Sequence, residues 1–229
     1  MTLDPIQVRV LGALIEKEIV TPENYPLSQN ALLAACNQRS SRDPVMDLSE
    51  EQVRQALHSL EDMGLTAVVR DSRVAKYEHC IRTVLNLRRD ETAILCLLFL
   101  RGPQTPGELR ARADRMYSFD GLEGVESTLA RMTAQPAATE DQPGGIREQR
   151  PLAVVLPRQP GSREARYAHL LGGPVEAAAR ESSSDRPRTR DASPEDGGLA
   201  ERVRELETEV AALQAAVARI EAILKGGTS

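Results

Sequence analysis

The sequence predicts a mainly α-helical protein with small β-hairpins, organised as tandem winged helix-turn-helix domains followed by a disordered linker and a C-terminal coiled-coil helix. Three observations predict this fold class. A short phrase occurs twice, the same order of helix and strand signals precedes each copy, and the C-terminal segment carries a heptad pattern. Together they divide the chain into residues 1–82, 83–171, 172–198 and 199–225.

The phrase S-R-x-A-basic-Y-x-H stands at residues 72–79 and again at residues 162–169. In an extended strand, side chains alternate between faces, so the arginine, alanine, tyrosine and histidine of each copy share one face. Two strands with the same face chemistry indicate a duplicated unit. Residues 67–69, A-V-V, match residues 153–155 in the same way, so the duplication extends upstream of the phrase.

The first unit begins with three helix signals. Asp4 and Pro5 open a helix as N-cap and first-turn proline, and its apolar stripe continues to about Lys17. Ser28 caps a second, short helix. A capping box, S-E-E-Q at residues 49–52, precedes the third helix. We therefore expect three consecutive helices before the first strand.

A β-hairpin follows the third helix of each unit. Gly64 ends that helix in the first unit, and strands are expected at 65–69 and 74–79 around a turn at 70–73. Three helices followed by a hairpin is the element order of a winged helix-turn-helix. The elements expected in the second unit are helices at 90–100, 105–116 and 121–132 and strands at 152–156 and 163–170, with a wing turn at 160–162 and a surface loop at 136–150.

Four stretches of the two units are long and distinctive: LDPIQVRVLGALIEKE (residues 3–18), TPENYPLS (21–28), NQRSSRDPVM (37–46) and RGPQTPGELR (101–110). They resemble the motifs of the bacterial YceH family, and the resemblance covers roughly residues 3–171. It implies a tandem winged-helix fold. The family is functionally uncharacterised, so the resemblance implies no catalytic or ligand residue. The loop at 136–150 is longer than the family's usual turn.

The last quarter of the chain differs from the rest in composition. Residues 172–198 are almost free of apolar side chains and are expected to form a disordered linker. Residues 199–225 carry apolar residues at alternating spacings of four and three, with valine and leucine at a and leucine and isoleucine at d, which favours a parallel dimeric coiled coil. The alternative is one amphipathic helix packed on the chain's own domains, but this stripe is narrower than such a face. The predicted dimer seam is Leu199, Val203, Leu206, Val210, Leu213, Val217, Ile220 and Leu224.

Composition limits the classes of function. Aromatic residues make up 3% of the chain and tryptophan is absent, so the cores must be aliphatic. The three cysteines form no C-x-x-C pair, which fits structural burial in a reducing compartment. We find no leader, no membrane span and no motif for a nucleophile, a phosphate loop or a metal. We therefore expect a soluble cytoplasmic protein that is not an enzyme and uses no cofactor or metal.

Charge is unevenly distributed along a chain whose net charge is −5. Residues 1–80 carry a net charge of −4, residues 81–171 a net charge of +2, and residues 172–229 a net charge of −3. The third helix of the first unit is acidic and would be repelled by phosphate, whereas the second unit offers arginines on its second helix and wing. The candidate nucleic-acid-binding residues are Arg110, Arg112, Arg115, Arg158, Arg163 and Arg166 of the second unit, and Arg73 and Lys76 of the first wing.

Two hypotheses about function follow. The first is a dimeric DNA-binding regulator whose contacts come mainly from the second unit. The second is a protein-protein interaction module or adaptor that does not bind DNA, favoured by the acidic first unit. Two interpretations of the wing arginines stay open: they can contact phosphates, or they can pair with acidic neighbours within the fold and have no binding role. Fold analogy narrowly favours the first hypothesis.

Overall fold

The structure is a computed structural model that describes residues 1–70, 74–134, 151–158 and 164–173. These residues all belong to one compact unit of the chain, Met1–Arg180. The predicted linker and the predicted coiled-coil seam lie outside the described residues, apart from the first two linker residues. The same holds for residues 71–73 of the first predicted wing and residues 159–163 of the second, which include Arg73 and Arg163, and for the whole of the predicted surface loop at 136–150.

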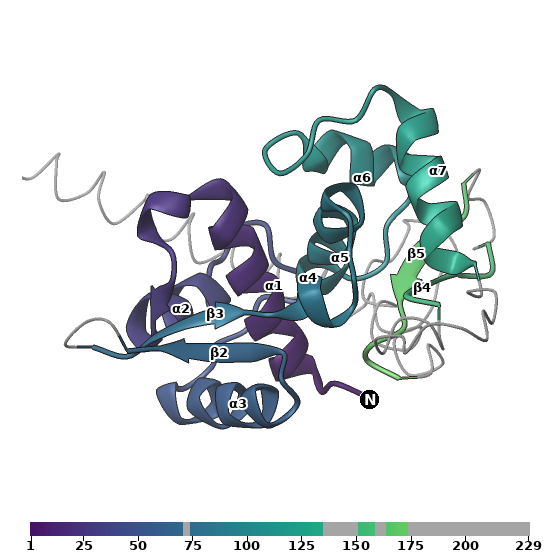
Figure 1. Ribbon diagram of the computed structural model, residues 1–229. Coiled ribbons are helices and arrows are strands. Elements are labelled where there is room, and N and C mark those ends of the chain that lie inside the picture. The colour runs from purple at the N-terminus through teal and green to yellow at the C-terminus, as the bar shows by residue number, and fades with distance from the viewer. Residues whose placement is uncertain (71–73, 135–150, 159–163, 174–229) are drawn as a thin grey trace, which may run out of the picture. The chain divides into compact units, whose positions relative to one another are not determined.

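The protein is mainly helical with small antiparallel sheets, and one order of elements occurs twice (Figure 1). The first series consists of α1 (Pro5–Val20), α2 (Gln29–Cys36), α3 (Glu50–Asp62), β2 (Thr66–Val69) and β3 (Lys76–His79). The second consists of α5 (Arg89–Arg101), α6 (Pro106–Ala113), α7 (Leu122–Thr133), β4 (Ala153–Val155) and β5 (Tyr167–His169). The short helix α4 (Ile81–Val84) and a loop connect the two series.

The predicted helix starts are confirmed by the capping contacts. The Asp4 carboxylate accepts hydrogen bonds from the backbone amides of Ile6 and Gln7, and a capping box also begins α3. Helix α1 extends beyond the predicted end at about Lys17 and stops at Thr21, because a residue before proline, here Pro22, avoids helical geometry.

Two small pairings were not predicted, and both extend the repeat. Strand β1 (Leu27–Ser28) joins β3, with Leu27 opposite Tyr77, so the first sheet has the order β1-β3-β2. In the second series, Gln104 and Tyr167 form an isolated bridge, and their backbone amides and carbonyls exchange two hydrogen bonds of 3.0 and 2.8 Å. The two tyrosines are the equivalent residues of the repeated phrase. Each therefore pairs with the segment just before the second helix of its series.

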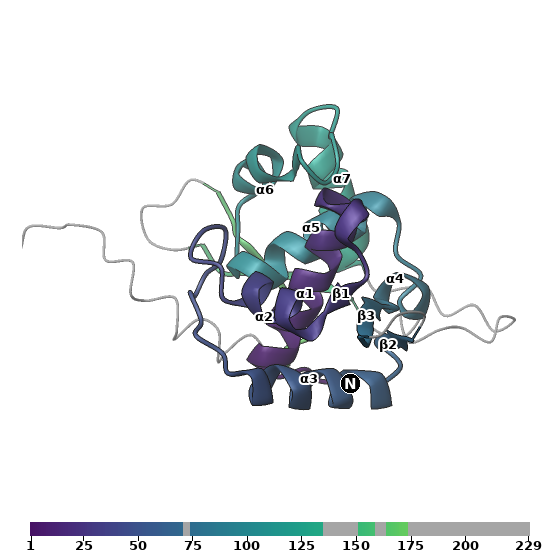
Figure 2. The ribbon, with the colours of Figure 1, turned by 90° about the vertical axis from the view of Figure 1, so that its left-hand side faces the viewer.

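The first helix of each series lies in the middle of the core. Residues Gln7 to Ile15 of α1 are all buried, as are Glu91 to Leu100 of α5, and a helix buried on every side is an interior helix. Figures 1 and 2 show α1 and α5 side by side. A Cβ atom on Gly12 would lie 2.8 Å from Cδ2 of Leu100, so glycine permits this close approach. The two series consequently share one hydrophobic core.

Candidate anion-binding cleft

A buried arginine fixes the loop between α2 and α3. Arg9 of α1 is 1% exposed, and its guanidinium donates hydrogen bonds to the carbonyls of Cys36 (3.0 Å) and Pro44 (2.5 Å). Burial lowers the pKa of Arg9, and the nearby Arg42 lowers it further. Because Cys36 ends α2 and Pro44 lies eight residues further on, this one side chain sets the path of the backbone between them.

A second buried arginine holds the middle of the same loop. The Arg42 guanidinium pairs with both carboxylate oxygens of Glu16 in α1, at 3.1 and 2.5 Å, and donates to the carbonyls of Ala35 and Ser41. Bidentate arginine–carboxylate pairs are strong and geometrically specific. Ser41 has a φ of 61°, a left-handed conformation that is uncommon for a residue other than glycine. The loop is therefore held in one conformation by buried charge.

The outer part of this loop borders a cavity of about 570 Å³. The opposite walls come from the last turns of α1 and α5 and from α6 with the residues that follow it. Figure 2 shows α6 above the α1–α2 region on the side that faces the viewer. Residues Gln38 to Ser41 line the cavity on the loop side. We call this cavity the cleft.

Basic side chains dominate the lining of the cleft. Its basic residues are Lys17, Arg39, Arg101, Arg112 and Arg115. Its one carboxylate, Glu16, is already bound by the buried Arg42. Within the described part of the chain, Arg39, Arg101 and Arg115 form no ion pair. Burial lowers the pKa of Arg101, and the positive charges of Arg112 and Arg42 lower it further. Such an arrangement can bind an anion.

Comparison with known proteins gives the family. A family model described as "Protein of unknown function, DUF480" matches residues 3–162. The chain belongs to this family. The resemblance to the YceH family is thereby confirmed, since that family is UPF0502, the name carried by the relatives. A UPF0502 protein of an Acidovorax species is 47% identical over 93% of this chain and 90% of its own length. A UPF0502 protein of Koribacter versatilis is 55% identical over 75% of this chain and 74% of its own length, and one of Pseudomonas fluorescens is 42% identical over 96% and 94%.

The arginines predicted from the sequence of this DUF480 chain divide into two groups. Arg112 and Arg166 are both held by Glu108, with nitrogen–oxygen distances of 3.5 and 3.7 Å, and Arg112 also donates to the side-chain oxygen of Gln104 at 2.6 Å. Their charges are therefore partly neutralised. Arg110, Arg115 and Arg158 are exposed and form no ion pair with any residue that the structure describes, and Lys76 is half-buried on β3.

The cleft unites only part of the predicted set. Arg112 and Arg115 line it, whereas Arg110, Arg158, Arg166 and Lys76 do not. Sequence reasoning missed Lys17, Arg39 and Arg101 as members of a site. All three lie within the stretches that resemble the YceH motifs, which is the signal that could have found them.

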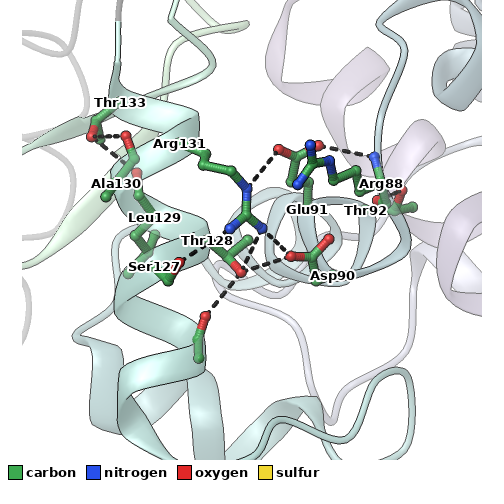
Figure 3. A network of polar contacts seen from close by, with 11 residues as sticks. Arg88, Asp90, Glu91, Thr92, Ser127, Thr128, Leu129, Ala130, Arg131 and Thr133 are labelled. Carbon is green, nitrogen blue, oxygen red and sulfur yellow. Dashed lines mark hydrogen bonds and ion pairs between the residues drawn. The ribbon is translucent and has the colours of Figure 1, made fainter.

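The third helix of neither series presents an unpaired arginine. In α3, Arg54 pairs with Glu51 one turn away. Figure 3 shows Arg131 of α7 turned toward Asp90 and Glu91 at the start of α5. The same Asp90 carboxylate accepts a hydrogen bond from the Thr128 hydroxyl at 2.8 Å, so the network fastens α7 to α5. Arg131 therefore serves packing, and the basic character of this DUF480 protein lies elsewhere.

A second cavity, of about 480 Å³, lies between α3 and the hairpin of β2 and β3. Glu51, Glu61, Arg54 and Arg70 contribute charges of both signs to its lining, with Tyr77 among the other lining residues. This mixture distinguishes it from the basic cleft. It gives the acidic third helix of the first series a neighbouring hollow in which a protein segment could lie.

Reactive or metal-binding groups do not gather in the described ranges of this DUF480 chain. No group of three His, Cys, Asp or Glu residues there could hold a metal ion. Burial raises the pKa of the Cys36 thiol to about 12 and raises that of Cys96 as well, so both stay protonated and unreactive at neutral pH. None of the described helices is both long and apolar enough to cross a membrane.

Proposed function

We propose that the chain is a non-enzymatic tandem winged-helix protein that acts as a dimeric DNA-binding regulator. The repeated order of three helices and a hairpin supports the winged-helix assignment. The observation that carries the DNA proposal is the set of exposed arginines of the second series, Arg110, Arg115 and Arg158, without an acidic partner in the described residues. Phosphate contacts need such uncompensated positive charge.

The proposed mode is contact with the phosphate backbone, with little reading of bases. In helix-turn-helix proteins the recognition helix lies in the major groove, and arginines on it read guanine. Here Arg54 of α3 is paired with Glu51, and Arg131 of α7 is turned into the fold. Binding should therefore tolerate changes of sequence and depend strongly on salt.

The experiment is a salt titration of binding to mixed-sequence duplex DNA. Replacing Arg110, Arg115 and Arg158 with alanine should weaken binding and flatten the slope of log affinity against log salt by about one unit for each lost contact. Arg54→Ala is the matched control, because this arginine is also exposed but paired with Glu51. A parent protein with no measurable affinity at low salt, or a triple variant that binds like the parent, refutes the proposal.

Dimerisation is proposed through residues 199–225, whose heptad pattern supplies the reason. Two copies joined by this coiled coil would offer two sets of arginines to one duplex, each set connected to the coiled coil by its own linker at residues 172–198. Linked binding modules gain affinity when the linker can span both sites. The dimer proposal is thus separable from the DNA proposal and has its own test.

A second candidate function is an adaptor that binds another protein. The cavity between α3 and the β2–β3 hairpin favours it, because Glu51 and Glu61 border a hollow of about 480 Å³ in an acidic part of the chain. A basic segment would complement this surface. Reversing the charge of Glu50, Glu51 and Glu61 should then abolish the affinity capture of a partner protein that the parent recovers from cell extract, while the melting temperature stays unchanged. Retained capture would exclude the surface.

A further inference from the structure

We propose that the cleft is a binding site for a small ligand that carries a diphosphate group. The proposal does not depend on DNA binding, since it concerns a different set of residues apart from Arg115. It rests on the excess of positive charge, on the shape of the cavity and on the fixed position of its walls.

The protein balances only part of the positive charge of the cleft. Arg39 lies in the loop after α2, Arg101 ends α5, and Arg115 lies in the turn after α6. None of the three forms an ion pair within the described ranges. Like charges held together repel one another. Burial is the main cause of the lowered pKa of Arg101, and the positive charges of Arg112 and Arg42 lower it further. An anion in the cleft would remove that repulsion.

The number and type of these groups select a ligand with more than one negative charge. Three unpaired guanidinium groups can form bidentate hydrogen bonds to phosphate oxygens, for which arginine is particularly suited. The Ser40 and Ser41 hydroxyl groups are also in the lining and add donors that carry no charge. A diphosphate, with several oxygens spread over two phosphorus atoms, matches donors on opposite walls better than a monovalent anion does.

The size of the cleft admits more than the phosphates. A volume of about 570 Å³ falls within the range of small-molecule sites. Val20 and Met116 lie in the lining beside the basic groups, which provides apolar surface for an organic part of the ligand. A DNA duplex is too wide to enter a cavity of this size. The ligand class is therefore a small diphosphate, either inorganic or attached to an organic group.

The walls of the cleft are held in place before any ligand binds. Arg42 and Arg9 fix the loop that carries Arg39, and both are buried. The backbone amide of Asp43 in this loop donates to the carbonyl of Leu100 in α5 at 2.8 Å, which fixes the neighbouring Arg101 relative to the loop. A preorganised site binds without the cost of ordering its own groups.

Isothermal titration calorimetry of the full chain at low salt tests the proposal, with inorganic pyrophosphate and ADP as probes. The parent should bind at least one probe saturably at one site. Arg39→Ala and Arg115→Ala should each weaken binding about tenfold or more, the effect of losing one hydrogen-bonded charge. Arg39 is exposed and Arg39→Lys keeps its charge, so the lysine variant should retain part of the affinity.

Arg110→Ala is the matched control, because Arg110 is exposed on α6 but does not line the cleft. It should bind the probes within about twofold of the parent while losing affinity for DNA, which separates this proposal from the proposed function. Equal affinity for both probes identifies the diphosphate alone as the recognised group, and tighter binding of ADP adds the organic part. Absence of saturable binding, or equal losses in Arg110→Ala and Arg39→Ala with unchanged melting temperatures, overturns the proposal.

Discussion

His169 should make the protein less stable in mild acid, and the size of the effect can be worked from its surroundings. Its ring lies edge-on to Phe99, with ring centroids 4.9 Å apart, and its Nδ1 is buried with no hydrogen-bond partner in the described residues. Burial lowers the pKa of His169 from 6.5 to about 4. The folded protein therefore holds this ring in the neutral form.

The direction of the effect follows from proton binding. Below pH 6.5 the unfolded chain binds a proton at His169, whereas the folded chain binds it only near pH 4 and below. Stability contributed by the neutral ring is therefore complete above pH 6.5 and is lost as the pH falls toward 4. A difference of about 2.5 pH units corresponds to about 3 kcal/mol at 1.36 kcal/mol per unit, of which about 2 kcal/mol is lost by pH 5.

The perturbation is His169→Phe, which keeps an aromatic ring against Phe99 and removes the titrating group. Urea denaturation at pH 7, 6, 5 and 4.5 gives the free energy of unfolding of parent and variant. The stability of the variant relative to the parent should rise by about 2 kcal/mol between pH 7 and pH 5. His58→Phe is the control, because the His58 side chain is 78% exposed on α3. Parallel pH profiles of the parent and His169→Phe would refute the conclusion that the folded protein keeps the His169 ring neutral.

Three further predictions concern packing, buried charge and assembly. Gly12→Ala should lower the free energy of unfolding by about 1–3 kcal/mol, because the new methyl group would lie 2.8 Å from Leu100. An unchanged or higher urea midpoint would contradict the close contact between α1 and α5. Arg42→Met should lower the free energy of unfolding by about 3–5 kcal/mol in urea denaturation, because it leaves the largely buried Glu16 carboxylate without its arginine partner. A decrease below about 1 kcal/mol would show that water replaces Arg42 at Glu16. Deletion of residues 199–229 should convert the proposed dimer to a monomer in light scattering, and an unchanged mass would exclude the coiled coil.

Local features of the fold were predictable from the sequence, because their causes lie within a few residues. The capping residues Asp4, Ser28 and Ser49 mark helix starts through hydrogen bonds to amides two or three positions away. Strand β1 and the bridge between Gln104 and Tyr167 were not predictable in this way. A pairing of one or two residues has no alternation to detect, and it forms only when distant segments meet.

The cleft was only partly predictable for the same reason. Arg112 and Arg115 attract attention as a basic run on the helix predicted at 105–116, which in the structure ends at Ala113. Arg39 and Arg101 belong to different elements that meet only in the fold. The pairing of Glu108 with Arg112 four residues later follows the helix repeat and could have been expected. Its second contact, with Arg166, depends on the strand β5 reaching α6, which no local pattern indicates.

The burial of α1 and α5 against each other has a consequence for how such a chain can change over time. The first helix of each series lies inside the common core, so a substitution there changes the packing of both series. The later elements of each copy, including α3 and α7, keep exposed faces on which residues can be exchanged one copy at a time. Two series of elements in the same order can thus carry opposite net charges, −4 over residues 1–80 and +2 over residues 81–171, while they share one core.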